Sequence, residues 1–195
     1  MKGDMALARG DLPAAAEFVA SIRSILNDTR YHDQYHLPMV RLETELRLAQ
    51  GGPAGALAAV EDALDRFDVR LSPRYAWPLL VAGARACAAA ATGRDETLTA
   101  RAAAVRDRLH AEAGKLAVDG LAQQAHQLTF AAEAGRAGRK AWDEAAQAWE
   151  ALGEPYPLAL TLLRSAEAAL SEGDRDGGTT RLRRAAGLAQ RLGAG

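Results

Sequence analysis

Apolar residues recur every three or four positions along almost the whole chain, which is the period of a helix that buries one face. The pattern is clearest in the last quarter, where three successive segments carry it. The inward positions expected there are Trp142, Ala145, Ala146 and Trp149, then Leu158, Leu162, Ala166, Ala169 and Leu170, then Leu182, Ala185, Ala186, Ala189 and Leu192. Because Trp142 and Trp149 share a face, we expect both rings to fill a seam between the terminal hairpins.

Turn signals divide the rest of the chain into segments with the same period. We expect helices over residues 12–26, 34–50, 54–67, 73–91, 96–112, 121–134 and 140–152, and a short helix before Gly10. Asp11 and Asp119 are expected N-caps, and Ser72-Pro73 is a helix start with proline at the first helical position. In the helix over residues 12–26 the expected inward residues are Ala15, Phe18, Ile22 and either Ile25 or Leu26. No segment alternates as a strand does.

The turn glycines indicate a repeat. Gly10, Gly51, Gly93, Gly135 and Gly173 are separated by 41, 42, 42 and 38 residues. Tetratricopeptide repeats have about 34 residues and HEAT-like repeats about 40–47, and hairpins of both kinds bury their inner faces only by stacking. An inward alanine follows the turn glycine by five positions at Ala15 and Ala56, whereas Leu98 and Gly178 stand there in two other repeats. We therefore predict an irregular, all-α, tetratricopeptide-like superhelix of about five antiparallel helical hairpins with a period of about 40. It should form a single helical-repeat domain over residues 1–195.

Composition narrows the classes of function. The 24 basic and 25 acidic residues give a net charge of −1, without the basic excess that nucleic-acid-binding domains usually carry. The single cysteine, Cys87, excludes an intramolecular disulfide and lies in an apolar run, so we expect a buried core residue. Because no signal peptide and no uninterrupted apolar span is present, we expect a cytoplasmic protein without membrane contact.

The richest cluster of polar and aromatic side chains is DTRYHDQYH, residues 28–36. If it is helical, His32 and His36 lie one turn apart, a spacing that can grip zinc, but no third histidine is nearby and we assign no metal. The plainer interpretation is packing of the rings at a helix start with their polar edges in water. Alternatively, Tyr31, His32, Tyr35 and His36 line a groove for a ligand or a peptide, and they are our candidate site residues.

Three further candidates lie on helices that we expect to face the concave side of the array, where solenoids bind partners. Arg74 and Tyr75 begin the helix over residues 73–91, and His126 lies among glutamines in the helix over residues 121–134. Tyr75 and Trp77 cannot point the same way on a helix, so at least one belongs to the core. Surface glutamine and histidine side chains are also ordinary solvated positions, which is the competing interpretation for His126.

The basic run Arg181, Arg183 and Arg184 could contact phosphate, but acidic residues lie close to it in sequence. We interpret it as a solvated outer face with local ion pairs, and we expect no direct contact with nucleic acid.

No catalytic constellation emerges from the sequence. His110 has no nucleophile motif around it, and Ser165 lacks the glycine-flanked elbow of hydrolases. No phosphate-binding loop of the type G-x-x-x-x-G-K-[ST] occurs, so we expect neither ATP binding nor another cofactor, and we do not expect an enzyme. A cluster of acids with perturbed pKa values in one deep pocket would favour an active site between hairpins.

Residues 142–195 resemble the end of the helical-repeat region in large ATP-binding transcriptional regulators of the LuxR type from actinobacteria. The shared phrase comprises Trp149-Glu150-Ala151-Leu152-Gly153, Pro155-Tyr156-Pro157-Leu158-Ala159, Glu167-Ala168-Ala169-Leu170, Gly173-Asp174-Arg175 and Leu192-Gly193-Ala194. In that family an ATP-binding module precedes the repeats and a helix-turn-helix domain follows them. The resemblance implies that this chain is an excised sensor segment of a larger regulator, which receives a small-molecule or protein signal and biases the ATPase and DNA-binding modules of the parent chain.

A free-standing scaffold that binds a peptide in its groove, unrelated to transcription, is the alternative function. Stacked hairpins also expose apolar faces at their ends, so a homodimer that involves the helix before Gly10 is a further expectation.

Overall fold

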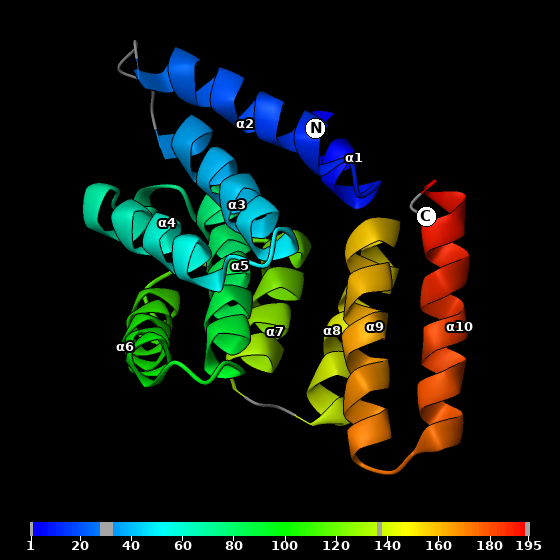
Figure 1. Cartoon of the computed structure of the whole chain (residues 1–195). Coiled ribbons are helices and arrows are strands. Elements are labelled where there is room, and N and C mark those ends of the chain that lie inside the picture. Colours follow the sequence, from blue (N-terminus) through cyan, green and yellow to red (C-terminus); the bar gives the residue numbers. More distant parts are fainter. Residues whose placement is uncertain (1, 28–32, 136–137, 194–195) are drawn as a thin grey trace. The chain divides into compact units, whose positions relative to one another are not determined.

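The computed structural model describes residues 2–27, 33–135 and 138–193. Within these ranges the chain is helical apart from its turns, and no strand occurs (Figure 1). The all-α class and the antiparallel helical hairpins expected from the sequence are confirmed. Among these residues no helix is long and apolar enough to span a membrane.

The helices gather into two compact units, Met1–Ala117 and Val118–Gly195. The first unit contains α1 (Lys2–Ala8), α2 (Leu12–Asn27), α3 (Asp33–Ala49), α4 (Pro53–Arg66), the 3-10 turn η1 (Val69–Leu71), α5 (Pro73–Ala91) and α6 (Glu96–Ala113). They pair as the hairpins α1/α2, α3/α4 and α5/α6. The first helices of these hairpins stack in the order α1, α3, α5, and each second helix also packs against the next first helix, as in a tetratricopeptide array.

The second unit contains α7 (Leu121–Ala134), α8 (Arg139–Leu152), α9 (Pro155–Ser171) and α10 (Arg175–Arg191). These form the hairpins α7/α8 and α9/α10, joined through contact of α8 with α9. The expectation that residues 1–195 make one continuous domain stays a prediction.

All five turn glycines lie between the two helices of a hairpin, although their backbones differ. Gly10, Gly51 and Gly173 adopt φ values of 72°, 72° and 86°, a left-handed conformation that ends a helix cheaply only when the residue is glycine. The C-cap glycine Gly135 instead has a φ of −88°. The chain therefore uses more than one turn geometry.

Aspartates begin several helices, as expected for N-caps. Asp11 accepts a hydrogen bond from the Ala14 amide at 3.1 Å, and Asp174 accepts one from the Gly177 amide at 2.9 Å. The prediction for Asp119 is wrong because the residue before α7 is Gly120, one position later. Ser72 does precede α5, but its side chain makes no capping hydrogen bond.

Helix α5 is the centre of the first unit because it packs against α3, α4 and α6. Trp77 is 1% exposed, and its indole Nε1 donates to the Ala117 carbonyl at 3.0 Å. Trp77, rather than Tyr75, is thus the fully buried member of that pair. Cys87 is buried as expected, and burial raises the pKa of its thiol to about 11, so this cysteine is an inert packing residue.

Trp149 holds the second unit together. It packs in one cluster with Leu158, Leu162 and Leu188, which come from α9 and α10. Its indole Nε1 donates to the Thr129 hydroxyl on α7 at 2.9 Å. Trp142 is also buried. Trp149 thus packs between the terminal hairpins as expected, whereas the place of the Trp142 ring in the same seam stays a prediction.

Several positions expected to face inward are exposed. Leu170 is 48% exposed and Leu182 is 45% exposed, because α10 packs mainly on α9 and covers only one side of that helix. Of the two alternatives at the end of α2, Leu26 is buried and Ile25 is 54% exposed.

Candidate functional site

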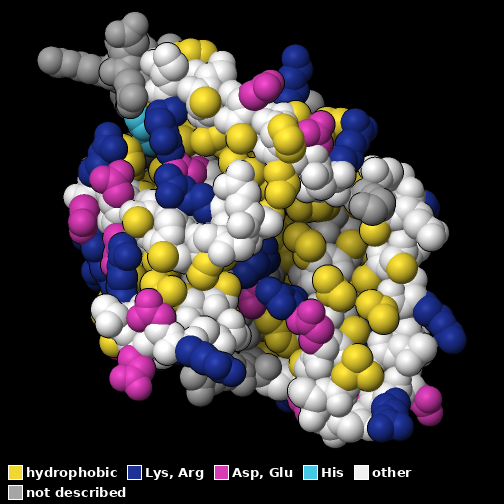
Figure 2. Space-filling model, in the orientation of Figure 1, with side chains coloured by type: hydrophobic (Ala, Val, Ile, Leu, Met, Phe, Trp, Pro, Cys, Tyr) yellow, Lys and Arg dark blue, Asp and Glu magenta, His cyan; other side chains and the backbone are white. Residues whose placement is uncertain are grey.

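A cavity of about 310 Å³ lies within the first unit, between α2, α3 and α4. Helix α3 packs against both other helices and contributes residues to the middle of the lining. The lining residues are Arg23 and Leu26 from α2, His36, Met39, Val40, Glu43 and Arg47 from α3, and Ala58, Ala59, Asp62, Arg66 and the adjoining Phe67 from α4. Figure 2 shows basic side chains with acidic ones among them on this part of the surface, at the upper left.

Glu43 is the buried carboxylate of this cavity, with only 8% of its side chain exposed. It bridges two arginines from different helices. Arg47, one turn later on α3, donates from Nε to Oε1 at 2.9 Å, and Arg23 on α2 forms an ion pair with Oε2. The two guanidinium groups are thereby held at the cavity wall while large parts of both side chains, 45% and 39%, remain exposed.

The charge state of Glu43 follows from this geometry. Burial alone would raise the pKa of its carboxyl group, but the hydrogen bonds from Arg23 and Arg47 outweigh burial and hold the pKa below its usual value. Glu43 is therefore ionised at neutral pH. A carboxylate fixed in this way is a poor proton donor or acceptor, which suits binding better than acid–base catalysis.

Two rings and a third arginine form another part of the lining. The His36 imidazole stacks on the Phe67 ring with 4.9 Å between centroids and 27° between planes. The guanidinium carbon of Arg66 lies 5.4 Å from the centroid of the same phenyl ring. Arg66 also donates to Asp62 at 3.1 Å in an exposed pair one turn apart. The lining thus joins flat apolar surface to cationic groups.

The other side of α4 packs against α6 through ion pairs. Helix α4 turns Glu61 and Asp65 toward α6, where Arg101 donates to Glu61 at 2.9 Å and Arg108 to Asp65 at 2.6 Å. Residues 58, 59, 62 and 66 of the same helix line the cavity instead. Ion pairs hold α4 to α6, and the cavity occupies the corresponding space between α4 and α2.

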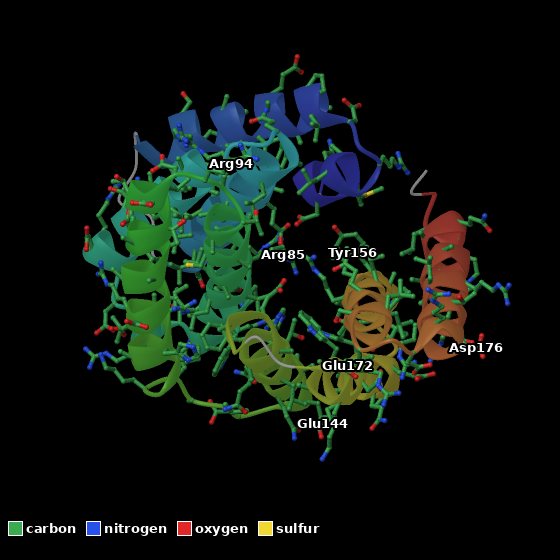
Figure 3. All side chains as sticks on the ribbon, turned by 60° about the horizontal axis from the view of Figure 1, so that its bottom comes forward. Arg85, Arg94, Glu144, Tyr156, Glu172 and Asp176 are labelled. Carbon is green, nitrogen blue, oxygen red and sulfur yellow. The ribbon has the colours of Figure 1, made fainter. Side chains whose placement is uncertain are left out.

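A ladder of charged side chains joins the first helices of the three hairpins in the first unit. Arg41 on α3 pairs with Asp4 on α1 and with Glu45 at 2.9 Å, and Arg85 on α5 lies 3.8 Å from Glu45. Figure 3 shows Arg85 on the side of α5 that faces away from α6. Since each of these charged side chains already pairs with another member of the ladder, we interpret the ladder as a stabilising feature of the stacked helices.

The basic run on α10 has acidic partners on another helix and close in sequence. Arg181 donates to Asp143 on α8 at 2.9 and 2.7 Å, and Arg184 pairs with Glu150 on the same helix. Arg181 also interacts electrostatically with Asp174 and Glu172, which lie close to it in sequence as expected. The ion pairs of Arg181 and Arg184 with carboxylates on α8 are additional to the local ones that the sequence suggested.

Asp143 ties three helices of the second unit together. Besides Arg181, the Ser165 hydroxyl on α9 donates to it at 2.6 Å. The hydrogen bond from Arg181, aided by that from Ser165, holds the pKa of Asp143 below its usual value. Nearby, Arg139 donates to Asp174 at 3.0 Å and pairs with Glu172, which lies at the α9/α10 turn (Figure 3).

The structure places the predicted groove residues in several locations. Tyr31 and His32 lie outside the described residues, so their part in a groove stays a prediction. Tyr35 is 51% exposed on the first turn of α3. His36 lines the cavity between α2, α3 and α4.

The other three candidates do not line this cavity. Arg74 is exposed at the start of α5, with its guanidinium carbon 6.0 Å from the centroid of the Tyr75 ring. His126 belongs to the second unit, where its ring meets the Trp149 ring edge-on, with 4.7 Å between centroids. Their role in binding stays a prediction.

Sequence reasoning missed the charged part of the cavity: Arg23, Glu43, Arg47 and Arg66 were not candidates. The spacing of Glu43 and Arg47 is a recognisable signal for an ion pair on one helix. The approach of Arg23 to the same carboxylate has no such signal, because it depends on how α2 packs on α3.

Within residues 2–27, 33–135 and 138–193, no three His, Cys, Asp or Glu side chains come together in an arrangement that holds a metal ion.

No protein-family model, curated protein or solved structure matched the chain.

Proposed function

We propose that this chain is a helical-repeat sensor domain that binds a signal molecule on its stacked hairpins. The observation that carries the proposal is the cavity between α2, α3 and α4. Its volume of about 310 Å³ lies at the lower end of the range of small-molecule pockets, about 300–1,000 Å³. Its lining combines apolar side chains with five charged ones, so it is more polar than most small-molecule pockets and suits a charged ligand better than a purely apolar one.

Within the proposal, a small molecule is a better signal than a protein. The charged ladder on α1, α3 and α5 is satisfied by its own ion pairs, so a peptide that bound there would have to compete with them. The cavity, in contrast, combines rings with three guanidinium groups around a space of metabolite size. A free-standing scaffold for a protein partner remains the alternative function.

The wider context of the proposal is a cytoplasmic transcriptional regulator of the LuxR type. Its support is the resemblance of the terminal phrase, most of which lies on α8, α9 and α10. In this context, ligand binding to the repeats would bias the ATP-binding and DNA-binding modules of the parent chain. The test is to extend the reading frame: no nucleotide-binding module upstream and no helix-turn-helix downstream would contradict the regulator context and leave the sensor proposal intact.

The sensor proposal is tested by a thermal-shift screen of the 195-residue chain against a metabolite library. A ligand at about a hundred times its Kd should stabilise the fold by about 2.7 kcal/mol. We expect at least one compound to raise the melting temperature by several degrees in a dose-dependent way. If no compound does so and the chain instead binds one specific protein stoichiometrically, the scaffold alternative is correct.

A further inference from the structure

We infer that the cavity between α2, α3 and α4 binds a small organic anion, one that carries a carboxylate or phosphate group on a flat apolar body. The inference rests on the sensor function proposed above and specifies its ligand class. Four features of the described residues carry it: the charge balance of the lining, the donors of the two arginines on Glu43, the stacked rings, and the volume.

The charge balance favours a negative ligand. Among the residues that the structure describes, Arg23, Arg47 and Arg66 line the cavity together with two carboxylates, those of Glu43 and Asp62. Glu43 is ionised, since its two arginine partners hold its pKa below the usual value. These described side chains therefore leave one positive charge over when both acids are counted, and a ligand with a single negative charge would balance it.

The donors of Arg23 and Arg47 exceed what Glu43 can accept. Two guanidinium groups carry about ten N–H donors, whereas one carboxylate offers about four lone-pair sites. Both side chains are more than a third exposed, so part of each planar fork is accessible beside the cavity. Such forks bind carboxylate and phosphate oxygens with two parallel hydrogen bonds, a geometry that ammonium groups do not match.

Glu43 acts as a positioning residue in this arrangement. Its buried carboxylate draws Arg23 from α2 and Arg47 from α3 to the same point. The side-chain entropy of two long arginines is thereby reduced before any ligand arrives, and a ligand that meets pre-organised groups loses less free energy on binding.

The stacked rings of the lining indicate which apolar group the ligand should carry. Phe67 and His36 form a stacked pair at 4.9 Å, and Met39, Val40 and Leu26 supply the adjoining apolar lining. A flat ring suits this surface, since aromatic groups pack well against stacked rings and adaptable methionine side chains. The cavity volume of about 310 Å³ fits a molecule of this kind and is small for a folded partner.

The inference is tested by calorimetric titration of the full chain with four probes. Benzoate and phenyl phosphate carry both the anionic group and the ring, benzyl alcohol carries the ring alone, and inorganic phosphate carries the anion alone. We expect saturable one-to-one binding of benzoate or phenyl phosphate, at least tenfold tighter than that of benzyl alcohol. Inorganic phosphate should bind more weakly than phenyl phosphate.

Two substitutions and one control connect the binding to this cavity. Arg47→Gln should weaken the Kd for the better probe by about tenfold or more, because a charge-assisted hydrogen bond is lost. Arg66→Gln changes an exposed side chain of the lining that does not contact Glu43, and it should also weaken the Kd for this probe. The matched control is Arg101→Gln, which removes an interhelical arginine on α6 outside the lining and should leave the Kd unchanged.

Two kinds of result would contradict the binding of an aromatic anion in this cavity. No saturable binding of benzoate or phenyl phosphate at millimolar concentration, equal binding of benzyl alcohol, or an unchanged Kd in both Arg47→Gln and Arg66→Gln would overturn the inference. A compound from the thermal-shift screen that stabilises the unsubstituted chain and Arg47→Gln equally would also overturn it, while the sensor proposal would stand.

Discussion

At the scale of single residues, Glu43 is the side chain on which the candidate site depends. It is buried, ionised and bound to arginines of two helices. A buried carboxylate is stable only when such partners offset the free energy lost on its desolvation. Loss of its charge therefore removes the group that holds the two guanidinium groups in place.

Glu43→Gln should therefore destabilise the chain by about 1–2 kcal/mol at neutral pH, as expected for the loss of charge-assisted hydrogen bonds at a buried group. The free energy of unfolding, from urea titration, is the measurement. Asp62→Asn is the control, since Asp62 is 60% exposed in its pair with Arg66 and should change stability by less than about 1 kcal/mol. Equal effects of the two substitutions would contradict the role given to Glu43.

The same carboxylate predicts a dependence on pH. The folded-state pKa of Glu43 lies below its ordinary value, so its stabilising contribution is present above the unfolded pKa of about 4.3 and is lost as the pH falls through the folded pKa. The difference in unfolding free energy between the unsubstituted chain and Glu43→Gln should shrink when the pH is lowered from 7 to about 3. A difference that stays constant over this interval would show that Glu43 is not stabilised as a carboxylate.

At the scale of helices, the sequence predicted where each helix begins and ends well, but it predicted poorly which side chains meet across neighbouring helices. The turn glycines and the Gly-Asp starts at Gly10-Asp11 and Gly173-Asp174 act locally, so their positions follow from sequence alone. The cavity walls and the pairing of Arg181 with Asp143 depend on which helices lie side by side, and no periodicity encodes that. For the same reason the exposure of Leu182 escaped prediction.

Close packing of helices is tested at Gly83 on α5. A Cβ there would meet Leu109 Cδ1 and Val60 Cγ1, each at 3.1 Å, and both of these side chains are fully buried. Gly83→Ala should therefore destabilise the chain by about 1–3 kcal/mol through overpacking, despite the better helix propensity of alanine.

The matched control is Gly187→Ala on α10, where among the described residues an added Cβ would meet just the flexible end of Arg191, at 3.8 Å from Nη1. This substitution should stabilise the chain by up to about 1 kcal/mol. Thermal denaturation measures both variants, and the same sign of effect at the two positions would contradict the packing described for α5.

The seam between α8 and α10 depends on Asp143, which accepts hydrogen bonds from Ser165 and Arg181. Asp143→Ala should lower the free energy of unfolding by about 1–3 kcal/mol. Glu144→Ala next to it removes an exposed carboxylate whose lysine partner is 3.9 Å away and should have little effect. If Glu144→Ala costs as much as Asp143→Ala, the three-helix contact is not what stabilises this unit.

At the scale of the whole chain, two compact units carry different features. Residues 1–117 contain three stacked hairpins, the charged ladder and the cavity, whereas residues 118–195 contain the tryptophan seam and most of the terminal phrase. The proposed signal site and the family resemblance therefore belong to different units.

Residues 1–117 should fold without the rest of the chain, because α5 has its packing partners α3, α4 and α6 within that unit. We expect a helical circular dichroism spectrum and a cooperative thermal transition for this fragment. A fragment that is unfolded at room temperature would show that the first unit depends on residues 118–195.

If the stacked hairpins of the first unit bind a small-molecule signal, the bound ligand should slow local opening of the helices that it contacts. Hydrogen–deuterium exchange of the full chain, with and without a compound that raises its melting temperature, measures this opening helix by helix. We predict slower exchange in α2, α3 and α4. Protection confined to α7–α10, or no change in any helix of the first unit, would contradict binding of the signal to the first unit.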